Sequence, residues 1–300
     1  PAPPAALAKA ILEQTGYTVD LSALDDRPVN VSVKKVEFWN AMDQLAGASD
    51  SRVVVSQGKI ALKPGASKGP SHVVGPFRFT APGVSIRGDV EAGTASYELG
   101  LAVAWEPGVH AYRIDGRPRI TRATDDAGRA VGVNAGGSRS FTAWNSAPLS
   151  VFPTGVTRGV KSLTLEGSVT VTMADELMTF DFGSAVKPVG PPAQKGVSAR
   201  AVKSAADGDD WVIEIELTYP RSDVVWESHE DYWLRNNVLR LLPPGGAPIK
   251  MDLDTLDRTI RYVAKGQGRR VALNWGLDYR TPGPMREVTV PFVLKNIPLP

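Results

Sequence analysis

The chain has 300 residues and a formal net charge of +2, with 34 Lys and Arg residues against 32 Asp and Glu residues. The two signs are interleaved, so the concentrated positive charge of a nucleic-acid-binding protein is missing and we expect no nucleic-acid partner. There is no cysteine, which excludes disulfide bonds, thiolate zinc sites and a cysteine nucleophile. With 29 glycines, 24 prolines and 7% aromatic residues, the composition favours turns and short strands over a helical bundle.

The first 63 residues predict a small α+β domain. Leu7, Ala10 and Ile11 share one helical face, and Gly16 supplies a C-terminal stop. A second amphipathic repeat runs from Phe38 to Ala46. The expected order is a helix at 5–15, strands at 17–21 and 28–33, a helix at 38–46, and strands at 52–55 and 59–62 around a Gln57-Gly58 turn.

Part of this domain resembles a known family. The segment contains an alternating strand from Val29, the helical sequence from Val36 to Ala46, a Val-rich strand and the closing strand from Gly58 to Leu62. It is similar to the short N-terminal domain of secretins and TonB-dependent receptors. The resemblance implies a periplasmic, non-catalytic domain that docks to a partner protein or to its neighbours in a ring. Nothing after Leu62 looks like a channel or a barrel receptor, so we carry over neither activity.

The remainder predicts two tandem immunoglobulin-like antiparallel β-sandwiches, which makes the chain mainly β. Short strand-like runs follow one another from Phe77, with turns at 125–128 and 134–137. Glycine and proline mark two linkers. The predicted division is an α+β domain at 1–63, a linker at 64–75, a sandwich at 76–188, a linker at 189–195 and a sandwich at 196–300.

The third segment repeats features of the second. The strand-like run at 97–104 is matched by one at 211–218, and the closing run at 179–182 is matched by one at 290–294, each with a proline beyond it. Internal repeats of this kind indicate a duplicated sandwich domain. The whole order of segments also resembles a group of uncharacterised exported proteins of planctomycete-type bacteria. That resemblance implies an envelope location and no activity.

Several kinds of catalytic and cofactor site are not indicated. His72, His110 and His229 lie in different segments without metal-ligand spacing. Residues 65–69 match Gly-x-Ser-x-Gly, but Pro70 follows where a nucleophile elbow needs a helix. No glycine-rich phosphate loop stands between a strand and a helix. We therefore expect no cofactor and no catalytic residue.

Residues 226–233 form the richest polar and aromatic segment. Aromatic rings beside carboxylates bind sugars or a partner's side chains, whereas the alternative is a loop whose Trp residues plug the end of a core. A catalytic pair would need Glu227 and Glu230 about 5–9 Å apart in a cleft, which their spacing does not demonstrate. The candidate binding residues are Trp226, Glu227, His229, Glu230, Tyr232 and Trp233.

Two further candidates come from other segments. Asp252, Asp254 and Asp257 are a weak calcium candidate, since the glycine and distal Glu of a calcium loop are missing, and a solvated strand-to-turn segment is the alternative. Trp39 lies just off the apolar stripe of its helix. It is either packed at the rim of the core or an exposed anchor for a partner.

These observations predict a non-catalytic, exported protein that docks or assembles in the cell envelope, periplasmic by resemblance. The partner is a protein or a second copy of the chain in a homo-oligomer. The alternative is a polysaccharide-binding or polysaccharide-degrading envelope protein that uses residues 226–233 on a glycan. The sequence starts at Pro1 without an initiator Met, which fits a processed start, and it contains no apolar run long enough for a signal peptide or a transmembrane segment.

Overall fold

The computed structural model describes residues 1–24, 28–31, 36–67, 69–89, 91, 94–137, 140–141, 144–157, 159–220, 224, 232–256 and 259–300. Over these residues the chain is mainly β, with several antiparallel sheets and two α-helices, which confirms the predicted fold class. The chain divides into two compact units, Pro1–Val171 with Val288–Pro300, and Thr172–Glu287. None of the helices in the described ranges is long and apolar enough to cross a membrane.

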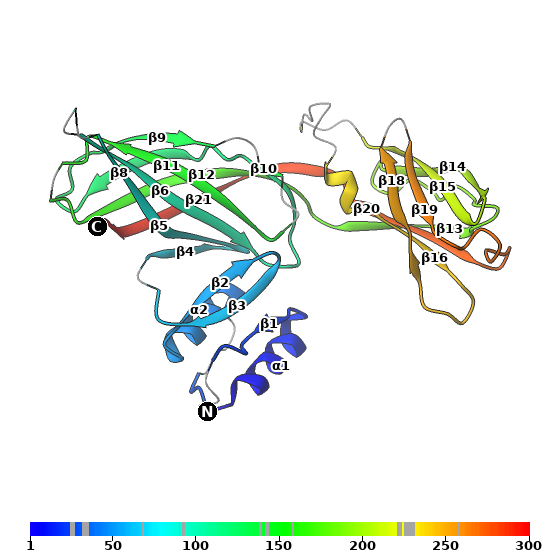
Figure 1. Ribbon diagram of the computed structural model, residues 1–300, viewed down its shortest axis with the longest axis horizontal. Coiled ribbons are helices and arrows are strands. Elements are labelled where there is room, and N and C mark those ends of the chain that lie inside the picture. Colours follow the sequence, from blue (N-terminus) through cyan, green and yellow to red (C-terminus); the bar gives the residue numbers. More distant parts are fainter. Residues whose placement is uncertain are drawn as a thin grey trace. The chain divides into compact units, whose positions relative to one another are not determined.

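The first unit begins with a small α+β domain, coloured blue in Figure 1. Helix α1 (Pro4–Thr15) has Pro4 in its first turn, and Gly16 ends it with a φ of 73°. The Gly16 N–H donates to the Leu12 carbonyl at 2.8 Å, so the predicted helix and its stop are confirmed. Strand β1 (Val19–Asp20) then pairs in parallel with β3 (Lys59–Pro64).

Helix α2 (Phe38–Ala48) supplies the centre of this domain's core. Phe38, Met42 and Leu45 recur on one face and are buried. Strand β2 (Ser51–Ser56) pairs with β3, and the sheet order β1-β3-β2 leaves β2 at an edge. Gln57 and Gly58 have φ values of 50° and 78°, as a two-residue hairpin turn requires, so the predicted hairpin is confirmed. The predicted strand at 28–33 falls partly outside the described residues; Val29 bridges Ala2.

The rest of the first unit is a β-sandwich. One sheet has the order β4-β5-β6-β11-β9, and the other has the order β10-β7-β12-β21 with β8 also paired to β12. Phe79 of β5 stacks on Phe292 of β21 with ring centroids 5.0 Å apart, so the two sheets share a core. The strands are β4 (Ser71–Val74), β5 (Phe77–Asp89), β6 (Thr94–Trp105), β7 (His110–Ile114), β8 (Arg119–Asp125), β9 (Gly132–Gly136), β10 (Ser140–Phe141), β11 (Ser146–Thr154), β12 (Ser162–Ala174) and β21 (Met285–Pro298).

The second unit is a smaller β-sandwich, with sheet orders β13-β20-β16-β17 and β14-β15-β19-β18. Phe180, Leu239 and Tyr279 from the first sheet and Ile213 and Tyr262 from the second share one buried core. The strands are β13 (Leu177–Ser184), β14 (Ser198–Asp207), β15 (Asp210–Thr218), β16 (Val238–Leu242), β17 (Ile249–Lys250), β18 (Asp252–Leu256), β19 (Ile260–Ala264) and β20 (Gly276–Pro282), and a 3-10 helix η1 covers Tyr232–Asn236.

The domain boundaries differ from the predicted ones, because the second unit is inserted between two strands of the first. Residues 177–184, predicted to close the first sandwich, form β13 and pair with β20 of the second unit. Residues 288–300, predicted to belong to the second sandwich, belong to the first unit. Sequence order does not show which sheet a strand joins, since the partner strand can lie a hundred residues away.

The two sandwiches nevertheless correspond in strand order. The order β5-β6-β11-β9 matches β14-β15-β19-β18, and β10-β7-β12-β21 matches β17-β16-β20-β13. The matched runs at 97–104 and 211–218 lie in β6 and β15, which take the same place. The matched closing runs lie in β13 and β21, each the outer strand of its sheet. This correspondence supports a duplication, which stays a prediction, as does an immunoglobulin-like strand order.

One predicted turn is wrong. Residues 134–137 contain two glycines, yet strand β9 runs to Gly136 and pairs with β11 from Thr154 to Ser150. Strand β9 is an outer strand of its sheet and is held by backbone hydrogen bonds to β11, so a sequence poor in β-branched side chains still forms it.

Candidate functional site

A groove of about 670 Å³ runs along strand β2 within the first unit. Arg52, Val53, Val54 and Val55 all line it. Successive side chains of a strand point to opposite faces, so a groove lined by four consecutive residues follows the edge of the strand. The sheet order ends at β2, and none of the described strands pairs with this edge.

The hairpin register determines which backbone groups of β2 face the groove. A two-residue turn makes Ser56 and Lys59 a hydrogen-bonded pair, and such pairs recur at every second residue. The Gly65 N–H donates to the Asp50 carbonyl at 2.9 Å, which fits this alternation. The N–H and C=O groups of Val53 and Val55 are therefore directed away from β3 and toward the groove.

The floor of the groove is a sheet face with small side chains. Thr80 on β5 pairs with Ala102 on β6, and Ala102 pairs with Pro148 on β11. Ala104 and Ser146 form the next pair along the same face. Such small residues leave space above the sheet for the side chains of another strand.

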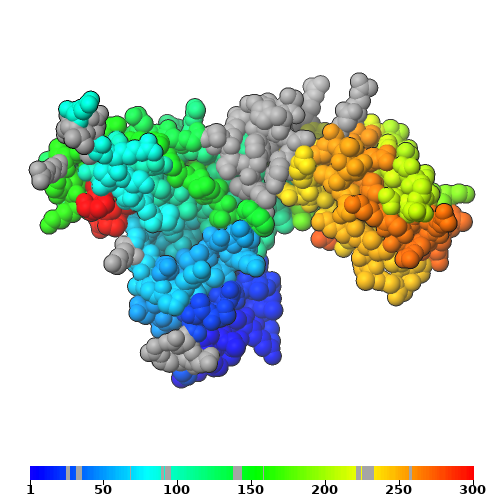
Figure 2. All heavy atoms as spheres, viewed as in Figure 1, coloured from blue at the N-terminus to red at the C-terminus, as the bar shows by residue number. Residues whose placement is uncertain are grey.

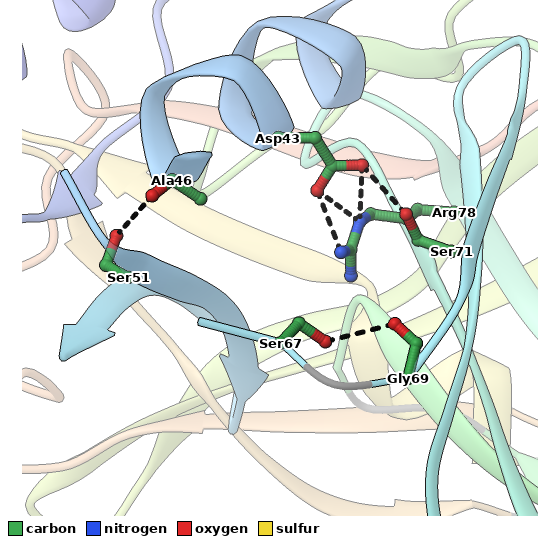
Figure 3. Close-up of polar contacts among 7 residues, drawn as sticks. All are labelled: Asp43, Ala46, Ser51, Ser67, Gly69, Ser71 and Arg78. Atoms are coloured by element: carbon green, nitrogen blue, oxygen red, sulfur yellow. Dashed lines mark hydrogen bonds and ion pairs between the residues drawn. The ribbon is translucent and has the colours of Figure 1, made fainter. Parts of the chain in front are cut away.

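Contacts between α2 and the sandwich hold the groove together (Figure 3). Asp43 of α2 accepts hydrogen bonds from Nε and Nη2 of Arg78 at 3.1 and 2.8 Å, and a third from the Ser71 hydroxyl at 3.1 Å. Arg78 is 7% exposed and Asp43 is 30% exposed, so the carboxylate neutralises a guanidinium that is almost removed from water. Arg52 is exposed and donates to the Pro64 carbonyl at 2.7 Å. The described lining includes no carboxylate, so Arg52 makes the groove positive.

Two glycines permit close approaches around the groove. The hairpin tip meets Trp144, since a Cβ on Gly58 would lie 3.1 Å from the indole ring. Near the other end, a Cβ on Gly69 would lie 2.6 Å from the Ala81 carbonyl oxygen, which no ordinary side chain tolerates. The Ser67 hydroxyl donates to the Gly69 carbonyl at 3.2 Å and fixes this turn (Figure 3).

Trp39 does not form an exposed anchor. Its side chain is 0% exposed, and its indole N–H donates to the Pro76 carbonyl at 2.9 Å. The chain's own sandwich therefore covers the side of α2 on which Trp39 lies. The packed alternative is the correct one.

The aromatic candidates at 226–233 are only partly described. Trp226, Glu227, His229 and Glu230 lie outside the described residues. Tyr232 begins η1, and the Trp233 ring meets Tyr219 edge-on with centroids 5.2 Å apart. Burial raises the pKa of Tyr219 well above its ordinary value, and its hydroxyl donates to the Pro282 carbonyl at 2.7 Å. Trp233 thus packs on a structural tyrosine of the second unit.

Of the aspartate candidates, Asp252 begins strand β18 and Asp254 lies in an ion-pair network. Asp254 lies 2.9 Å from Nε of Arg261, whose other nitrogens contact Asp207 at 3.0 Å and Glu214 at 3.5 Å. Asp257 lies outside the described residues. Within the described ranges no group of three or more His, Asp or Glu side chains is arranged to hold a metal ion. Arg261 thus pairs with the Asp254 carboxylate, which a calcium ion would need as a ligand.

Comparison of the chain with protein-family models, with curated proteins and with solved structures finds no match in any of the three. The groove along β2 was not predicted either. The sequence contains part of the signal, because the Val-rich run at 52–55 predicts the strand that borders the groove. The floor combines residues of β5, β6 and β11, and their proximity to β2 depends on tertiary structure.

Proposed function

We propose that the protein is a non-catalytic docking protein whose strand β2 binds an extended segment of a partner protein by strand addition. The observation that supports this most is the free edge of β2, whose four consecutive residues line a groove over a small-residue floor. Backbone hydrogen bonds to an edge strand give affinity, and pockets for alternate side chains give specificity.

The groove suggests the character of the bound segment. Every second side chain of the segment faces Ala102, Ala104 and Pro148, where medium-sized apolar groups fill the space left by the small floor. A carboxylate near the exposed Arg52 adds charge complementarity. We therefore expect about four to six residues in extended conformation, matching the six residues of β2 at about 3.3 Å per residue.

The same function fits an exported protein of the cell envelope. The resemblance of residues 29–62 to a periplasmic docking domain supports this location. A second copy of the chain is the other candidate partner. Light scattering over a concentration series separates the two, because a constant mass of 32.1 kDa favours a foreign segment and a rising mass favours self-assembly. The polysaccharide alternative uses residues 226–233, of which 226–231 lie outside the described part of the chain.

A displayed library of random decapeptides tests the proposal. Selected peptides should bind the intact protein, and Val55→Pro should weaken them at least about tenfold, because proline removes one of the two N–H donors that face the groove. Val202→Pro is the matched control. Val202 is an exposed valine at a bulge of the edge strand β14, in the other unit.

Methylation of the peptide backbone separates strand addition from ordinary side-chain binding. Two peptides carry N-methyl groups, one at the odd and one at the even residues of a selected sequence. One pattern should abolish binding, because it removes the N–H groups that face β2, and the other should leave binding intact. Equal effects of both methylation patterns, or equal binding to wild type and Val55→Pro, would contradict strand addition at β2.

A further inference from the structure

A second groove, of about 610 Å³, lies between α1 and α2 on the same domain. Leu7, Ala10 and Ile11 of α1 form its wall, and Phe38, Ala41 and Met42 of α2 form its floor. Both triplets have the spacing i, i+3, i+4, so each helix presents one continuous face to the groove.

The wall is incompletely covered. Of the twelve residues of α1, Pro4 alone is buried. Leu7 and Ile11 pack against the domain's core but are only partly buried. In Figure 2 the dark blue N-terminal segment, which contains α1, forms part of the visible surface. A helix whose apolar face is only partly buried has room for another element against it.

One end of the groove is acidic. The Tyr17 hydroxyl donates to the Glu106 carboxylate at 3.3 Å, and Glu37 also lines this end. Burial raises the pKa of Glu106, and the neighbouring Glu37 adds to the effect. The described residues that line the groove include no Lys, Arg or His. Within the described lining, no cation therefore lies beside these two carboxylates.

We propose that this groove binds one amphipathic helix of a partner protein, with the helix's apolar face against α1 and α2 and a Lys or Arg beside Glu37 and Glu106. Side-chain ridges of a third helix fit between α1 and α2, and such a helix docks in a groove through its side chains at i, i+3, i+4 and i+7. The length of α1, about 18 Å at 1.5 Å per residue, matches about three turns of the docked helix. The groove along β2 has different lining residues, so the two sites can be occupied independently.

A displayed library of amphipathic fourteen-residue helices tests this site on the whole protein. Leu, Ile, Met and Val vary at the apolar positions, and all residues are allowed elsewhere. Selection should enrich helices with Lys or Arg at one end of the apolar face. Exchange of that residue for Glu should weaken binding of the peptide about tenfold or more. In the protein variant Glu106→Gln, the affinities of the original peptide and its Glu version should differ by less.

Three variants locate the binding. Ala41→Arg places a long cation in the groove and should abolish binding. Leu12→Gln alters an exposed position on α1 outside the groove lining and should leave binding unchanged. Val55→Pro should have no effect on helix binding, which separates this site from the β2 groove.

The proposal fails if selection yields no helix that distinguishes wild type from Ala41→Arg, or if Lys and Glu peptides bind equally. A different outcome is that no helix is selected, while the wild-type protein binds phosphatidylcholine vesicles and Ala41→Arg does not. That outcome would contradict the proposal and assign the groove to a lipid surface.

Discussion

At the scale of single residues, the Asp43–Arg78 pair decides how firmly the α+β domain is held to the first sandwich. Arg78 is nearly buried, so loss of its carboxylate leaves a cation without compensation. We expect Asp43→Leu to lower the free energy of unfolding of the first unit by about 2–4 kcal/mol, with a smaller loss when Arg78→Met is combined with it. Urea denaturation of wild type, Asp43→Leu and the double variant measures this, and a double variant no more stable than Asp43→Leu would contradict it.

Glu106 gives a second residue-scale prediction, on pH. Burial raises the pKa of Glu106 above its ordinary 4.5, although the hydrogen bond from Tyr17 opposes the shift. The folded state then binds more protons than the unfolded state, so stability falls as pH rises from 4.5 through the raised pKa. Glu106→Gln removes this titration and should stabilise the first unit at about pH 7 but not at about pH 4. Thermal unfolding at several pH values tests this, and parallel profiles for wild type and variant would be inconsistent with it.

At the scale of elements, neighbouring positions of β2 should respond oppositely to proline. The Val54 N–H belongs to the β2–β3 ladder, so Val54→Pro should destabilise the hairpin by about 3 kcal/mol. The Val53 N–H faces the groove, and Val53→Pro should cost less than about 1 kcal/mol. Hydrogen exchange at Ala61 and Lys63, which pair with Val54 and Arg52 in hydrogen-bonded pairs, reports on the ladder. A larger loss of protection in Val53→Pro than in Val54→Pro would reverse the register assigned to the edge.

The elements themselves were largely predictable from local sequence, whereas their partners were not. Gly16 and the Gln57-Gly58 turn are read from residue type, because positive φ values favour glycine. The burial of Trp39 could not be read from its helix, since the carbonyl of Pro76 that receives its N–H comes after a linker. The β2 groove was missed for the same reason, because its floor is assembled from β5, β6 and β11.

At the scale of the whole molecule, the chain order predicts an asymmetric response to truncation. Strand β21 ends the chain but contributes Val290, Phe292, Leu294 and Ile297 to the core of the first unit, each at most 3% exposed. Their burial stabilises that unit by about 6–12 kcal/mol, comparable with the total stability of a domain. Removal of residues 288–300 should therefore unfold the first unit and leave residues 172–287 folded.

Hydrogen exchange measured by mass spectrometry on the truncated chain tests this nested arrangement. Peptides from β5 and β6 should lose protection, while peptides from β15 and β19 keep it. Retained protection in β5 and β6 would mean that the first unit folds without β21. Loss of protection in both units would mean that the second unit cannot fold without the first.

Strand addition at β2 is tested most directly by hydrogen exchange of single amides in the protein with and without a selected decapeptide. The amides of Val53 and Val55 should exchange at least about tenfold more slowly in the complex, because the peptide carbonyls accept their hydrogen bonds. The Val54 amide, already bonded to β3, should change little. A peptide that binds tightly while Val53 and Val55 exchange as before would contradict the assignment of β2 as the docking edge.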